Sequence, residues 1–162
     1  MATDAFLKID GIVGESTDDQ HGGEIELLSY SHGMSQPSSI ASGTGGRTAE
    51  RVSMSDFSVM KVVDKASPHI AQACCDGRHI PKVTIVLCEA SGEKHTFMEY
   101  LLEDVIISSV QSSGSQGGDK PLESVTFNFG KISWTYTPIG HDGKPGSKVG
   151  PIGWNLETNT KI

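Results

Sequence analysis

Apolar residues occupy every second position in several runs of the chain, the period expected of strands with one buried face. This alternation predicts strands within residues 5–9, 25–34, 52–63, 82–87, 97–110, 125–136 and 152–157. The apolar parity changes at 27–28 and again at Gly130-Lys131, where we expect bulges or bends. Seven or eight antiparallel strands, two of them long and bent, predict a mostly β fold. We expect a small antiparallel β-barrel of two packed sheets, in one domain spanning 1–162.

Residues 25–34 show the parity change most clearly. Ile25 and Leu27 share one parity, and the larger residues that follow share the other: Leu28, Tyr30, His32 and Met34. We expect these residues on the apolar face, with Tyr30 in the core together with Trp134 and Trp154. The opposite face of this strand carries only small residues, namely Ser29, Ser31 and Gly33.

One short helix is predicted over residues 67–76. Ser67 is the expected N-cap, Pro68 suits the first helical position, and Gly77 suits the position after the end. Positions i, i+3 and i+4 form a narrow apolar stripe: Ile70, Ala73 and Cys74. A helix of this length is unstable alone, so we expect it to flank the sheets.

Residues 37–50 differ in composition from the strands because serine and glycine dominate and Ile40 is the one large apolar residue. This segment is predicted to be a long flexible loop, and long loops without their own structure are usually functional or disordered. The candidate interaction residues of the loop are Ser39, Ile40, Ala41, Ser42, Gly43, Thr44, Gly45, Gly46 and Arg47.

Composition narrows the function classes. The chain has 162 residues, 36% of them hydrophobic, which suits a globular domain, and a net charge of −7, which disfavours a general nucleic-acid binder. No apolar run approaches the ~20 residues that span a bilayer. Residues 1–10 lack the basic and apolar regions of a signal peptide, so we expect folding in the cytoplasm. Three cysteines, two of them adjacent, do not form a disulfide framework.

Motifs for chemistry are missing from the sequence. No serine sits in a G-x-S-x-G turn, and the glycine-rich segments lack the G-K-[ST] ending of a phosphate-binding loop. Cys74 and Cys75 fall at a helix C-terminus, where the dipole disfavours a thiolate, so Cys74 is expected to pack inward. The histidines are scattered singly. We therefore predict no catalytic residue, no metal site, no cofactor, and a protein that is not an enzyme.

A set of segments carries a family resemblance through its order and spacing. These segments are 6–16 (FLKIDGIVGES), 24–36 (EIELLSYSHGMSQ), 57–68 (FSVMKVVDKASP), 107–110 (ISSV), 125–129 (VTFNF) and 153–155 (GWN). Together they resemble the haemolysin-coregulated protein (Hcp) family, the tube subunit of bacterial type VI secretion. His32 departs from the pattern, because many relatives have an aromatic residue there.

The resemblance implies a structural role. Members form hexameric rings that stack into a hollow tube, which a contractile sheath ejects together with a spike protein. The lumen can carry small effector proteins. The same likeness implies export from the bacterial cytoplasm without a cleavable signal peptide, assembly on a baseplate, and no cofactor, nucleic acid or membrane insertion. It places Ser29, Ser31 and Gly33 at the lumen, with Ser31 the strongest candidate.

Stacking of rings needs a projecting and adaptable segment, so residues 39–47 are expected to contact the next ring.

Other interpretations of the sequence remain open. A small-molecule-binding β-barrel would instead need an apolar interior with a few converging polar groups. A phage-type tail tube subunit would share the architecture, and an enzyme or effector would need measurable turnover.

Overall fold

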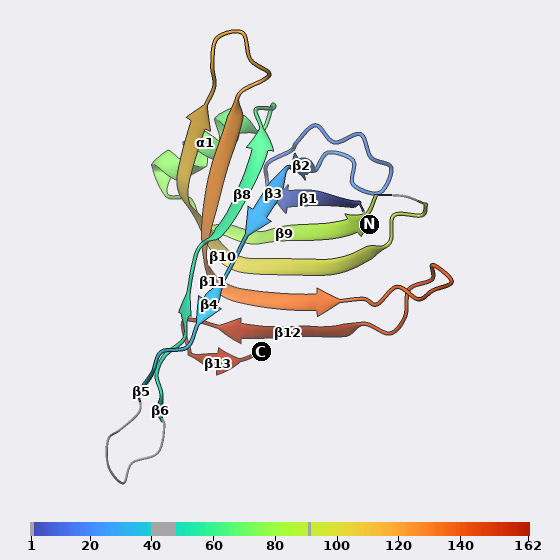
Figure 1. Ribbon diagram of the computed structural model, residues 1–162. Coiled ribbons are helices and arrows are strands. Elements are labelled where there is room, and N and C mark those ends of the chain that lie inside the picture. Colours follow the sequence, from blue (N-terminus) through green and yellow to red (C-terminus); the bar gives the residue numbers. More distant parts are fainter. Residues whose placement is uncertain (1, 40–47, 91) are drawn as a thin grey trace.

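The computed structural model describes residues 2–39, 48–90 and 92–162. Within these ranges one helix, α1, accompanies a set of β-strands (Figure 1). The elements are β1 (Thr3–Ile9), β2 (Ile25–Leu27), β3 (Ser29–Ser31), β4 (Met34–Ser35), β5 (Ser38–Ser39), β6 (Thr48–Ala49), β7 (Ser53–Met54), β8 (Phe57–Val62), α1 (Ser67–Asp76), β9 (Ile80–Glu89), β10 (Thr96–Ser113), β11 (Leu122–Tyr136), β12 (Val149–Asn155) and β13 (Thr160–Lys161). The mostly β prediction with one short helix is confirmed.

One antiparallel sheet in the order β13-β12-β11-β10-β9-β1-β2 forms the body, and β8 pairs with both β11 and β3. The long strand β11 serves two neighbours: residues 122–127 pair with β8, and residues 131–136 pair with β12. At the other side, the Leu28 N–H donates to the Met60 carbonyl at 2.8 Å. The pairing thus leaves β8 through β11 and returns to it through β2 and β3, and its two packed faces enclose the core.

The bend predicted at Gly130-Lys131 is present. Phe129 and Ile132 are both buried although their parity differs, and Asp104 opposite has a positive φ of 53°. A Cβ at Gly130 would lie 2.8 Å from a Glu157 carboxylate oxygen, so a larger residue there would require the Glu157 side chain to move. The break predicted near 27–28 falls at Leu28, where the expected single strand divides into β2, β3 and β4.

Large apolar side chains fill the space between the two faces of the sheet. The following are at most 2% exposed: Leu7, Ile9, Ile25, Phe57, Ile70, Ile85, Leu102, Ile107, Phe127 and Ile132. Burial of this kind stabilises a fold by about 1.5–3 kcal/mol for each large side chain. Among the described residues, no helix is both long and apolar enough to cross a membrane.

Helix α1 follows the prediction except at its first residue. Ile70 and Ala73 are buried, Cys74 packs partly against the core, and Gly77 ends the helix at φ 63°. The predicted N-cap is wrong by one position, because Ala66 is the N-cap and makes no side-chain capping bond. The hydroxyl of Ser67 turns inward instead.

A buried ionic network holds the Ser67 hydroxyl. The fully buried Lys61 ammonium donates to Glu123 at 2.8 Å, to Asp64 at 2.9 Å and to Ser67 at 3.2 Å. The Ser67 hydroxyl in turn donates to Glu123 at 2.8 Å. These contacts join β8, β11 and the start of α1. A buried charge is tolerated only when it is paired, so the network fixes the position of the helix.

Several side chains expected on the apolar face lie at the surface. Leu28 is 60% exposed, Met34 49% and Tyr30 38%, so their prediction as inward residues is wrong. Ile152 of β12 is also exposed, at 57%. Parity identifies the apolar face of a strand, but it does not reveal whether another layer covers that face. Trp134 and Trp154 are only half-buried, and Trp134 packs against the edge of the core.

A two-stranded arm projects from the body between β3 and β8 (Figure 1). Met34 pairs with Met54 at its base, and Ser38 pairs with Ala49 further out. The ends of the segment predicted as a loop at 37–50 are therefore paired strands rather than loop. The candidate residues Ile40, Ala41, Ser42, Gly43, Thr44, Gly45, Gly46 and Arg47 lie outside the described residues, and Ser39 forms part of β5.

Candidate functional surface

The three candidate lumen residues lie at or just beyond β3. Ser29, Ser31 and Gly33 are all exposed. The Gly33 N–H donates to the Ser55 hydroxyl at 3.0 Å, and that hydroxyl donates back to the Gly33 carbonyl at 3.0 Å. This reciprocal pair ties the end of β3 to the segment before β8, so the three residues sit on a fixed backbone.

Strand pairing extends the surface of Ser31 across four strands. Ser31 lies opposite Ser58 of β8, Ser58 opposite Thr126 of β11, and Thr126 opposite Ser109 of β10. Directly opposed residues in antiparallel strands share one face of the sheet. Four hydroxyl side chains therefore form a row, although they come from segments nearly 80 residues apart in sequence.

A second row lies beside the first. Ser29 is opposite Met60, Met60 is opposite Ser124, and Ser124 is opposite Gln111. We name the surface formed by both rows the hydroxyl face, and we include Ser108, whose hydroxyl lies 2.7 Å from that of Thr126. Its hydroxyl-bearing members are Ser29, Ser31, Ser58, Ser108, Ser109, Ser124 and Thr126. Sequence reasoning found two of these seven, Ser29 and Ser31. It missed the other five because they join the surface only when β8, β10 and β11 come together.

Hydrogen bonds within the surface hold its side chains in place. The Thr126 hydroxyl lies 2.7 Å from that of Ser108 and 2.6 Å from that of Ser109. Asp56 accepts from Ser108 at 2.7 Å and from Asn128 at 3.0 Å. Asp56 contributes one carboxylate to this network, whereas the side chains of both rows are uncharged. Such a surface is wettable and carries little fixed charge.

An imidazole lies under the end of this sheet. The His32 ring packs at centroid distances of 5.3 Å from Phe57, 5.9 Å from Phe129 and 6.4 Å from Trp134. Neither ring nitrogen meets a hydrogen-bond partner among the described residues. Burial lowers the pKa of His32, which keeps the ring neutral at pH 7. His32 thus acts as one more aromatic ring in this cluster.

Burial also affects the tyrosine beside this cluster. Tyr100 stacks edge-on to Phe57 at 5.2 Å and lies 5.7 Å from Tyr30. Burial and a hydrogen bond with Tyr30 raise the pKa of Tyr100 to about 12. The phenol therefore stays protonated at physiological pH, and the cluster carries no charge next to the hydroxyl face.

One trio of side chains has the order of a nucleophile, a base and an orienting acid. The Cys88 sulfur lies 3.4 Å from Nε2 of His21, whose Nδ1 lies 2.8 Å from Glu24. Cys88 is fully buried, and burial raises the pKa of its thiol, opposite to the shift of an activated cysteine. The His21 ring also stacks on Phe6 at 4.5 Å. The trio therefore fastens the β1–β2 loop to β9.

The remaining chemistry is structural as far as the described residues show. No group of three or more His, Cys, Asp or Glu side chains is placed to hold a metal ion within 2–39, 48–90 and 92–162. Cys74 is half-buried against the core, as expected, and Cys75 is exposed.

Comparison with known proteins identifies the class of secretion machinery. The family described as "Type VI secretion system effector, Hcp" matches residues 6–136. Protein hcp1 of Pseudomonas aeruginosa is 39% identical over 165 aligned positions, covering 99% of both chains. A solved type six secretion system protein superposes with a TM-score of 0.95 at 38% identity, covering 99% of this chain and all of the other. Hcp1 of Salmonella typhimurium gives a TM-score of 0.80 at 31% identity, with 99% and 100% coverage.

These matches show that the chain is a type VI secretion system protein. Its fold, including the strand pairing described above, is shared with the solved structures. Within that class, the chain belongs to the Hcp family. The resemblance expected from the six sequence segments is confirmed.

Proposed function

We propose that this chain is the structural subunit of a type VI inner tube. It forms hexameric rings that stack into a hollow tube, and small effector proteins travel in the lumen. A contractile sheath ejects the tube with a spike protein at its tip, starting from a baseplate. The chain folds in the bacterial cytoplasm and leaves the cell in this way without a cleavable signal peptide. Its side chains make and break no bonds.

The observation that carries this proposal is the hydroxyl face. A channel that loads and releases protein cargo must stay hydrated without holding any one charge tightly. Neutral hydroxyls on four paired strands supply such a surface. The buried rings of Phe57 and Phe127 pack on the opposite face of the same strands. We assign Ser29, Ser31 and Gly33 to the lumen wall on this basis. We assign to the same wall the other members of the hydroxyl face: Ser58, Ser108, Ser109, Ser124 and Thr126.

The arm supports the stacking part of the proposal. Its paired strands extend away from the body as far as Ser39 and Thr48, so the described part of the arm already projects from the subunit (Figure 1). We propose that Ser39 to Arg47 contact the adjacent ring. Deleting residues 41–47 should leave single rings intact in negative-stain micrographs and weaken their stacking. Loss of the rings themselves would instead assign the segment to the ring.

The space between the packed faces disfavours a small-molecule carrier. Phe57, Phe127, Ile85 and Leu102 meet there and are fully buried, so side chains occupy the place where a ligand would sit. Micrographs of the purified protein test the proposal. Ring-shaped particles with a central hole are expected, and uniformly small featureless particles at the same concentration would contradict it.

A further inference from the structure

Exposed apolar side chains gather at the base of the arm. A groove of about 400 Å³ lies between the arm and the C-terminal strands, and we name it the arm-base groove. The residues that line it are Met34, Gln36, Val52, Met54, Trp134, Ile152, Gly153, Trp154, Lys161 and Ile162. Met34, Ile152 and Ile162 are each about half exposed or more. Exposed large side chains that cluster in this way mark contact surfaces on soluble proteins.

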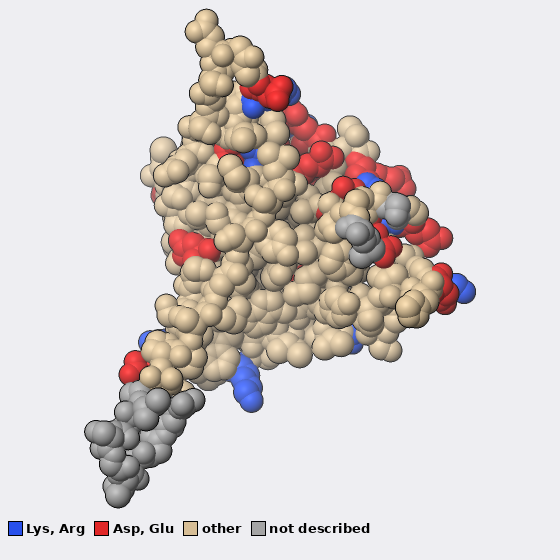
Figure 2. Space-filling view, in the orientation of Figure 1, with Lys and Arg blue, Asp and Glu red and all other residues tan. Residues whose placement is uncertain are grey.

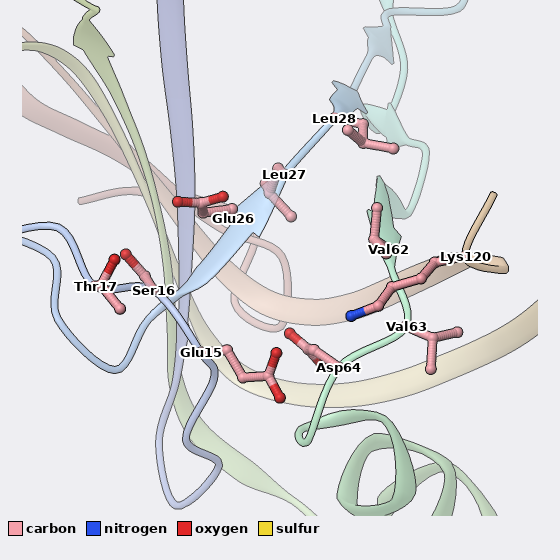
Figure 3. Close-up of a pocket in the computed structure, with 10 residues that line it drawn as sticks. All are labelled: Glu15, Ser16, Thr17, Glu26, Leu27, Leu28, Val62, Val63, Asp64 and Lys120. Atoms are coloured by element: carbon pink, nitrogen blue, oxygen red, sulfur yellow. The ribbon is translucent and has the colours of Figure 1, made fainter.

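A second hollow has a different chemistry. It lies between β2, the end of β8 and the β10–β11 turn, has a volume of about 320 Å³, and is named here the acidic cleft. The residues that line it are Glu15, Ser16, Thr17, Glu26, Leu27, Leu28, Val62, Val63, Asp64 and Lys120. Figure 3 shows the carboxylates of Glu15 and Asp64 close together, with Leu28 and Val62 on another side of the opening.

The two hollows carry opposite charge. Three carboxylates and one ammonium line the acidic cleft, and of the carboxylates Glu15 and Glu26 are exposed. The side chains lining the arm-base groove include one cation, Lys161, and no acid. Figure 2 shows acidic side chains gathered along the upper right of the molecule, over β2 and the β1–β2 loop. Opposite potentials favour the docking of one surface on the other.

The two surfaces cannot meet within one molecule. The arm-base groove is built on β12 and β13, at one end of the sheet order, and the acidic cleft on β2, at the other end. In Figure 1, β12 and β13 lie toward the bottom of the body and β2 lies toward its top. Contact between them therefore requires a second copy, joined head to tail, and a head-to-tail contact closes into a ring when its rotation divides the circle.

We propose that the arm-base groove of one copy binds the rim of the acidic cleft of the next copy. Leu28, the most exposed apolar residue of the rim, enters the groove beside Ile152, and Lys161 faces the carboxylates of Glu15 and Glu26. This inference rests on the proposed function, since it names the surfaces through which the ring would form.

Two aspartate variants test the pairing. Ile152→Asp places a charge in the arm-base groove, and Leu28→Asp places one on the rim of the acidic cleft. Both positions are exposed, so thermal unfolding of each variant should stay within a few degrees of wild type. Each variant alone is expected to be a monomer by native mass spectrometry. In an equal mixture, Leu28→Asp supplies an intact groove and Ile152→Asp supplies an intact rim. One contact can form between them, so a dimer containing one copy of each is expected, and nothing larger.

Other outcomes separate the failures. If either variant alone forms a dimer, the contact joins two identical surfaces and the head-to-tail assignment is wrong. If both variants still form rings, the ring uses other surfaces, and the proposed function stands while this inference falls. If the wild type itself is a monomer, the proposed function fails.

A matched control and a milder pair of variants complete the experiment. Val13 is as exposed as Leu28 and lines neither hollow, so Val13→Asp should keep the rings. Loss of rings in that variant would overturn the assignment, because any surface charge would then have the same effect. Should an aspartate variant fail to fold, Ile152→Ser and Leu28→Ser give the same comparison, with a weakened ring expected and an unchanged ring as the contradicting result.

Discussion

The two faces of β8 and β11 differ completely in chemistry although they share one backbone. Phe57, Val59, Val125 and Phe127 point inward and are at most 1% exposed. Between them, on the other face, stand Ser58, Met60, Ser124 and Thr126, reached by solvent. The inward side chains supply the burial that stabilises the fold, and the outward ones offer a polar surface that the fold does not need. Stability and assembly can therefore be altered separately by changing neighbouring residues.

The largest expected effect comes from emptying the inward face. Phe127→Ala removes a fully buried ring and should lower the free energy of unfolding by about 3–5 kcal/mol, measured by chemical denaturation. Ser124→Ala, three residues away on the outward face, should change it by at most about 0.5 kcal/mol. Similar losses for both variants would show that the two faces are not distinct.

A comparable loss is expected where the inward face carries a charge. Lys61→Met leaves the Glu123 carboxylate buried without its cation and should cost about 3–5 kcal/mol in the same measurement. The double variant Lys61→Met with Glu123→Leu removes both charges and should recover much of that loss. A double variant less stable than Lys61→Met would mean that the network contributes more than mutual neutralisation.

A smaller effect is expected from pH at the end of the sheet. Unfolded, His32 binds a proton near pH 6.5, whereas burial holds its pKa lower in the fold. The unfolded state thus binds more protons below that pH, and stability falls as the pH drops below about 6.5. His32→Phe keeps the aromatic packing and removes the titration. Wild type should lose more melting temperature between pH 7.5 and 5.5 than this variant does, and equal losses would contradict the account.

The smallest effect on stability is expected on the outward face, where the consequence is functional. Ser31→Gln should change the free energy of unfolding by at most about 0.5 kcal/mol and reduce the effector protein that co-purifies with the rings. Ser115→Gln, in the exposed β10–β11 turn, is the matched control and should retain cargo. Unchanged co-purification with Ser31→Gln would argue that Ser31 does not face the channel.

The sequence predicted the strands and the bend because both depend on neighbouring residues. Alternation at 125–136 gave β11 together with its change of face at Gly130, and Pro68 and Gly77 marked the helix. The prediction of Ser67 as the N-cap is wrong because its hydroxyl binds Lys61 and Glu123, which lie on the strands β8 and β11. A capping preference that acts locally cannot anticipate a long-range network.

Surfaces were harder to predict than elements. Ser29 and Ser31 could be found because they alternate with larger residues on one strand. Ser58 and Thr126 join them only through the register of four strands, which no single segment encodes. Conversely, Leu28 and Ile152 resemble core residues by parity, yet the described residues leave them 60% and 57% exposed. Exposed apolar residues such as Leu28 and Ile152 do not stabilise the fold of one copy, and we propose that they join two copies.

Native mass spectrometry of the wild-type protein at tens of micromolar tests the central claim most directly. A ring of identical subunits predicts a dominant species of six chains, about six times the 17.2 kDa of one copy. A single species at the mass of one chain, persisting as the concentration rises, would contradict the tube subunit and leave the hydroxyl face without a lumen to line.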